Sequence, residues 1–209
     1  ATVGQLTEAR ALLDVLATTN PVLVVPGNHD YAWKGNILRK DAWEHWTEHL
    51  GEPLGWSRRG VKWMSPSVSP AGIEGLGVWT HGKVAYIGID SGDPTGKEAS
   101  ARGLITKGMA RHLTEQLDAH ADKTRIAMLH HHPFDHHFFT ALHGAKRLMT
   151  ALKGRCELLL FGHDHKLGLW WAKDDIPLIA ASHKTTNTVF GEHLMITVIE
   201  ISNVGTDQA

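Results

Sequence analysis

The chain has 209 residues, of which 42% are hydrophobic and 21% charged, and its formal net charge is -1. These values are typical of one soluble globular domain with a sizeable core. A charge this close to zero counts against nucleic acid or an anionic membrane surface as a partner. No apolar run reaches the roughly 18 residues of a membrane span, and the single Cys156 cannot form an internal disulfide, which favours a cytoplasmic protein.

A helix followed by a buried strand is predicted at the start of the chain. Apolar residues recur at helical spacing from Leu6 to Ala17, and Asn20-Pro21 ends the pattern. The run 22–25 is short, continuous and rich in valine, which is typical of a strand buried on both faces of a sheet. It leads directly into the polar loop 26–30, with the sequence PGNHD.

The pattern is weaker between residues 31 and 70, where only one helix is indicated, carrying Trp43, Trp46 and Leu50. A further strand is predicted over residues 84–89, and it ends at Asp90-Ser91-Gly92.

The order of buried strand and polar loop then returns twice. The apolar run 125–129 leads into three histidines and a proline, and the run 158–161 leads into GHDH. A helix capped by Thr106 precedes the first strand and a helix over 141–152 precedes the second, as parallel crossovers require. His130 is expected to belong still to its strand.

Near the C-terminus, short turns without helices separate three predicted strands over 167–171, 177–181 and 194–201. This arrangement favours an antiparallel part or a second sheet. The predicted fold is α/β, a four-layer α-β-β-α sandwich with two central mixed sheets and helices outside.

The loops that follow the buried strands carry a set of metal-binding side chains. Ligands bind at the carboxyl ends of strands in open α/β sheets, so the three loops are expected to converge on one site. The donors are nitrogen and oxygen atoms of Asn28, His131, His163 and His165, a set suited to zinc, manganese or iron rather than calcium. A lone histidine at a strand end is usually an ordinary polar residue, but three loops of the same construction favour a shared metal site.

The motifs PGNHD, LHHHP and FGHDH resemble, in order and spacing, the last three signature motifs of the calcineurin-like metallophosphoesterase superfamily. Residues 89–91 and 103–106 resemble its class III cyclic-nucleotide phosphodiesterase branch. The resemblance implies two divalent or trivalent transition-metal ions (manganese, iron or zinc) that activate water for hydrolysis of a phosphodiester. The partner would be a small phosphate ester such as a nucleotide. The alternatives are a broad phosphomonoesterase and a catalytically impaired binding scaffold of this fold.

Carried over to this sequence, the family pattern makes Asn28, His131 and His163 ligands of the second metal and His165 a ligand of the first. His132 is the alternative to His131. The resemblance places His29 against the phosphate, where it would stabilise developing charge or protonate the leaving oxygen.

One departure from the family is large, because neither its DxH motif nor its GDxxD motif stands ahead of Pro26. Residues 1–209 are therefore expected to form a single metallophosphoesterase domain that lacks its N-terminal strand-helix segment. His136 and His183 follow predicted strands and are candidates for substrate binding. Surface or structural roles are expected for the remaining histidines considered: His45, His49, His81, His112, His120, His143 and His193.

Overall fold

The computed structural model describes residues 2–31, 42–51, 75–93, 101–134, 137–182 and 197–202. Its helices are α1 (Val3–Ala17), α2 (Asn28–Tyr31), α3 (Ala42–Trp46), the π-helical turn η1 (Thr47–Gly51), α4 (Lys107–Ala119) and α5 (Ala145–Leu152). Its strands are β1 (Leu76–His81), β2 (Val84–Ile89), β3 (Gly103–Leu104), β4 (Thr124–Leu129), β5 (Leu142–His143), β6 (Leu158–Phe161), β7 (Gly168–Lys173) and β8 (Ile176–Ala181).

Six of the strands form one mixed sheet with the order β1-β2-β4-β6-β8-β7. The four inner strands run parallel to one another, and β1 and β7 join as antiparallel strands at the two edges. The carboxyl ends of β2, β4, β6 and β8 therefore lie along the same edge of the sheet. β3 and β5 form a separate two-stranded parallel sheet.

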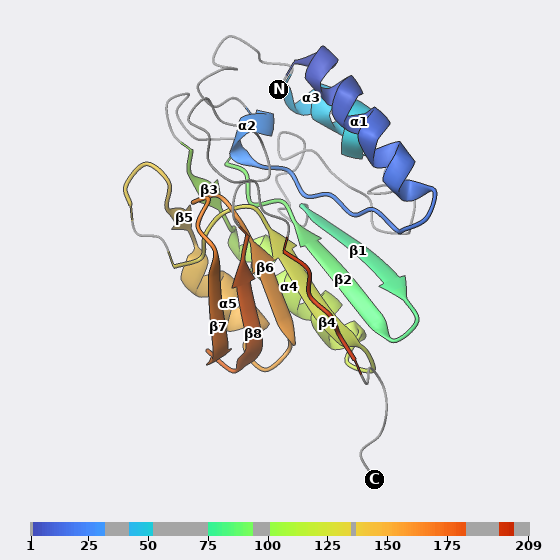
Figure 1. Cartoon of the computed structure of the whole chain (residues 1–209). Helices are drawn as coiled ribbons and strands as arrows, with labels where there is room; N and C mark the ends of the chain where they lie inside the picture. Colours follow the sequence, from blue (N-terminus) through green and yellow to red (C-terminus); the bar gives the residue numbers. More distant parts are fainter. Residues whose placement is uncertain are drawn as a thin grey trace.

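Helices α4 and α5 lie side by side against the sheet (Figure 1) and bury its main core. The Thr106 side chain caps α4 by accepting the Met109 N–H at 3.1 Å, as the sequence predicts. Leu113 and Leu117 of α4 and Leu148 of α5 are fully buried in this core. α5 begins later than the predicted residue 141, because Leu142 and His143 pair with β3 instead.

A second, smaller core holds α1 against α3 and η1. Leu6 of α1 packs there with Trp46, Leu50 and Trp79 of β1. The predicted helix over 6–17 is confirmed within α1, and the helix predicted near Trp46 is present as the short α3 and η1.

The predicted strand over residues 22–25 is wrong, since this run belongs to no sheet in the described structure. Leu23, Val24 and Val25 pack instead on the smaller core and stay partly buried. An apolar run forms a strand only where a neighbouring strand offers ladder hydrogen bonds, and residues 22–25 make no such pairing in the described structure.

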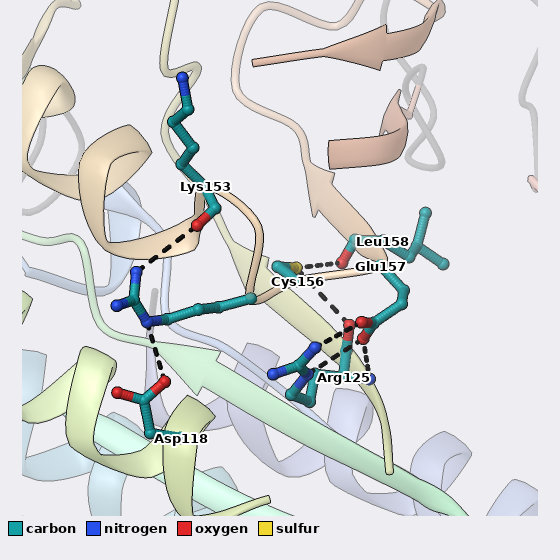
Figure 2. Close-up of polar contacts among 7 residues, drawn as sticks. Asp118, Arg125, Lys153, Cys156, Glu157 and Leu158 are labelled. Atoms are coloured by element: carbon teal, nitrogen blue, oxygen red, sulfur yellow. Dashed lines mark hydrogen bonds and ion pairs between the residues drawn. The ribbon is translucent and has the colours of Figure 1, made fainter. Parts of the chain in front are cut away.

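The start of β6 is fastened to β4 by a charged pair. The Arg125 Nη2 atom lies 2.6 Å from Glu157 Oε1, and the Arg125 backbone N–H also donates to Glu157 (Figure 2). Beside them, the Cys156 thiol donates to the carbonyl of Leu158 at 3.1 Å. Burial raises the pKa of Cys156 to about 12, so this thiol stays protonated and structural.

The C-terminal predictions are met in part. The hairpin β7–β8 is antiparallel, as expected, but β8 pairs in parallel with β6 and so extends the same sheet. Residues 197–201, the described part of the predicted strand 194–201, form no strand, and Val198 is 87% exposed. A mixed α/β fold is confirmed, while the four-layer arrangement with two large sheets stays a prediction. Every helix in the described ranges is too short or too polar to cross a membrane.

Replacing Leu148 with alanine is expected to destabilise the protein by about 2–5 kcal/mol, because the side chain is fully buried between α5 and the sheet and its loss leaves a cavity. Leu12→Ala is the matched control, since Leu12 also lies in a helix but is 70% exposed. The control should change the free energy of unfolding by no more than about 0.5 kcal/mol. Urea denaturation of both variants measures the difference, and equal effects would contradict the assignment of the core.

Candidate metal centre

Three histidine rings meet at the carboxyl edge of the sheet, where β4 and β6 end. The ring centroids of His131 and His163 lie 4.7 Å apart, and the His130 ring lies 5.1 Å from the first and 4.9 Å from the second. The parallel pairing of β4 with β6 brings them together, and the Gly162 N–H donates to the His130 carbonyl at 3.1 Å just beyond the strands.

The loop 26–30 adds Asn28 to this cluster from a distant part of the sequence. Asn28 Oδ1 lies 2.7 Å from His130 Nε2, which in turn lies 3.0 Å from His163 Nδ1. Gly27 allows the close approach, since a β-carbon there would come within 3.0 Å of the His130 ring. Asp30 holds the turn by accepting the Gly27 N–H at 2.7 Å, and burial raises the pKa of its carboxyl.

His131 is the most enclosed member of the cluster, with no exposed surface. Its Nδ1 atom lies 2.8 Å from Ser91 Oγ, and Ser91 is also fully buried. Among the described residues, the buried Nε2 of His131 has no hydrogen-bond partner. If Nδ1 carries the proton and donates to Ser91, the lone pair of Nε2 is available to a metal ion.

A short strand braces this arrangement from the side. Gly103 of β3 lies so close that a β-carbon would come 2.6 Å from His131 Cγ and 2.7 Å from the Ser91 carbonyl oxygen. The next residue, Leu104, donates its N–H to the same carbonyl at 3.0 Å. Only glycine fits at position 103 while the imidazole keeps its place.

Burial holds two of the clustered imidazoles neutral. It lowers the pKa of His130 to about 3 and that of His131 well below the ordinary value, and the neighbouring histidines add to both effects. Burial also lowers the pKa of His29, with a smaller contribution from His165. Neutral imidazole is the form that binds a metal ion.

The loop after β6 holds His163 and His165 in an unusual backbone conformation. Their φ angles are 75° and 56°, in the left-handed region that non-glycine residues rarely adopt. Such positions concentrate at functional sites. His163 is partly buried in the cluster, whereas His165 is exposed to solvent, as is His29.

The structure therefore brings Asn28, His131 and His163 into one cluster. His132, the alternative to His131, turns away: its ring packs on Phe161 with centroids 4.6 Å apart, and its Nδ1 accepts the Phe134 N–H. The metal-binding roles stay predictions. His136 and His183, the candidates for substrate binding, lie outside the described residues.

Two members of the cluster were not predicted. The expectation that His130 belongs to the strand is wrong, because β4 ends at Leu129 and the His130 side chain reaches Asn28. Ser91 received no role, although Asp90-Ser91 follows a buried strand next to β4 and is itself buried. Polar residues directly after a buried parallel strand are the signal that could have found Ser91.

A second group of side chains with the spacing to hold a metal ion lies on α3 and η1. One ligand atom each from His45, Glu48 and His49 lies within 4.8 Å of the others. His45 lies one helical turn before the adjacent Glu48 and His49, on a different part of the chain. Surface or structural roles are predicted from the sequence for the two histidines.

The chain matches the family model described as calcineurin-like phosphoesterase over residues 4–167, and it therefore belongs to that family. Membership makes it a metal-dependent phosphoester hydrolase in general terms and agrees with the mixed α/β fold. Among curated proteins, none matches the sequence.

Replacing Ser91 with alanine is expected to lower the free energy of unfolding by about 1–3 kcal/mol, because the buried Nδ1 of His131 loses its hydrogen-bond partner. Thr7→Ala removes a hydroxyl that bonds to the Val3 carbonyl on the exposed surface of α1 and serves as the control. Thermal and urea unfolding measure the stability of both variants. An equal loss of stability in the two would contradict the role of Ser91.

Proposed function

We propose that the protein is a phosphodiesterase with a dinuclear metal centre, in which Asn28, His131 and His163 hold the second ion and His165 contributes to the first. The observation that carries this proposal is the enclosed Nε2 of His131, which has no hydrogen-bond partner within the described residues. A buried polar atom without a partner costs free energy. A metal ion at this position would accept its lone pair.

The remaining donors support the same position. Asn28 supplies an amide oxygen and His163 an imidazole nitrogen, and both atoms contact the His130 ring. This mixture of nitrogen and oxygen donors fits zinc, manganese or iron. His130 Nε2 is a further candidate ligand, since it contacts both Asn28 Oδ1 and His163 Nδ1.

Metal ions bound here would supply Lewis-acid stabilisation of the phosphate and lower the pKa of water. The chain's own residues would orient and protonate the ester. His29 lies next to Asn28 at the start of α2 and is exposed, so it can reach a bound ester. Partial desolvation by the protein around it lowers the pKa of His29, and the negative charge of a bound phosphate would raise this pKa again, which favours proton donation to the leaving oxygen.

The first ion needs carboxylate ligands, which the family takes from DxH and GDxxD motifs that do not stand ahead of Pro26 in this sequence. The proposal is therefore most complete for the second ion, whose donors Asn28, His131 and His163 lie in residues 1–209. Preference for diesters is supported by the resemblance of residues 89–91 and 103–106 to cyclic-nucleotide phosphodiesterases. In the structure, Ser91 and Gly103 of these segments contact His131.

Hydrolysis of bis-p-nitrophenyl phosphate and p-nitrophenyl phosphate by the full-length protein, with manganese, zinc or iron added, tests the proposal. We expect metal-dependent turnover with a higher kcat/KM for the diester. A higher value for the monoester would identify a phosphomonoesterase. Tight metal binding without turnover of either compound would identify a binding scaffold.

Replacing His131 with alanine is expected to weaken metal binding by more than about 10- to 100-fold, the range seen when groups that merely orient a ligand are removed. His132→Ala is the matched control, because the ring of His132 packs against Phe161 and Trp170 and not in the histidine cluster. Competition with a chromogenic chelator measures both affinities. A larger loss in the His132 variant would shift the ligand by one residue, and His130→Ala would show whether that ring binds too.

His29→Ala in the full-length enzyme is expected to lower kcat by about 100- to 10,000-fold, as loss of general acid catalysis typically does, while metal content stays unchanged. Asn28→Ala should lower both together. Atomic absorption beside kcat separates the two roles. If the His29 variant lost metal in proportion to activity, His29 would be a ligand rather than the proton donor.

A further inference from the structure

A groove opens between α4 and α5, and none of the clustered histidines lines it. It has a volume of about 950 Å³, and five of the side chains that line it are cationic: Lys107, Arg111, Lys146, Arg147 and Arg155. No carboxylate lines this cavity in the described part of the chain. The whole protein has a net charge of -1, so this groove concentrates positive charge locally.

Nearby acidic groups neutralise only part of that charge. Arg155 Nε lies 2.8 Å from Asp118 Oδ1, and Arg111 Nε lies 3.8 Å from Glu115 Oε1. Both pairs are largely exposed and therefore weak. Five cations less two paired carboxylates leave about three positive charges along the groove.

The other three cations keep their charge available. Lys107 and Lys146 form no ion pair within the described residues and are exposed. Arg147 is held in place by a neutral group, since its Nη1 donates to the Ile105 carbonyl at 2.9 Å. Lys107 belongs to α4 and the other two to α5, so the charges face the groove from both helices.

The start of α5 adds an independent attraction for anions. Gly144 occupies the N-cap with a φ of 84° and provides no side-chain cap, and Ala145 and Lys146 line the groove beside it. Uncapped amides at a helix N-terminus carry partial positive charge and bind phosphate oxygens. A β-carbon at position 144 would come 2.8 Å from Arg147 Nη1, so glycine also makes room for the guanidinium.

We propose that this groove binds the phosphate chain of a small polyphosphate, with Lys107, Lys146 and Arg147 as its principal contacts. A chain of linked phosphates matches three cations spread over two helices better than a single phosphate does. The volume suits a ligand of small-molecule size. Ala110, Leu142 and Ala151 supply an apolar lining that would accommodate an organic group attached to the chain.

Isothermal titration of the full-length protein with sodium triphosphate, ATP and orthophosphate tests this assignment. We expect triphosphate to bind more tightly than orthophosphate and ATP at least as tightly as triphosphate. Lys107→Gln combined with Lys146→Gln should weaken triphosphate binding by about 10- to 100-fold, because two charge-assisted contacts are lost. Raising the salt concentration should weaken it further.

The matched control is Lys83→Gln combined with Lys153→Gln, which removes the same charge outside the groove. If local contacts decide the affinity, the dissociation constant of triphosphate should stay within about twofold of the value for the unaltered protein. A His163→Ala variant separates this site from the proposed catalytic one and should retain triphosphate binding. Equal weakening in the lysine control, loss of binding in the histidine variant, or equal affinity for orthophosphate would overturn the proposal. Hydrolysis by the groove variant should be unaffected, so failure here and failure of the proposed phosphodiesterase activity give different results.

Discussion

The parallel register of β2, β4 and β6 is the constraint on which the candidate site depends. Ile89 pairs with Leu129, and Met128 pairs with Leu160, so the three strands end almost level. Side chains alternate between the two faces of a sheet, and a slip of one residue would turn every side chain to the opposite face. Ser91 and His131 meet only in the observed register.

This register buries polar side chains at the carboxyl ends of the strands, which costs free energy. The three rings of His130, His131 and His163 are gathered where burial strongly lowers the pKa of the first two. A core of apolar side chains would fill the same space without that cost. Glycines at positions 27 and 103 let the backbone pass close to the rings of His130 and His131. Buried imidazoles with strongly lowered pKa values are expected in a binding site rather than in a structural core.

Helices and strands with a clear hydrophobic pattern are predicted correctly from the sequence. Elements that depend on tertiary contacts are predicted less well. α4, β4 and β6 lie where they are expected, because a capped amphipathic helix and short buried runs are local signals. Residues 22–25 carry the same signal as β6 but no sheet partner among the described residues, and strand formation depends on such a partner. Likewise His130 reads as the last residue of a strand, although the ladder ends before it.

The short strand β3 joins the two regions that carry proposals. At one end, Gly103 packs on His131 and Leu104 donates to the Ser91 carbonyl. Directly after the strand, the Ile105 carbonyl accepts from Arg147, whose charge faces the groove. An anion that fixed Arg147 would therefore also restrain the backbone next to the histidine cluster. A ligand that binds only the folded state stabilises that state, so an anion in the groove would also stabilise the frame that holds the histidine cluster.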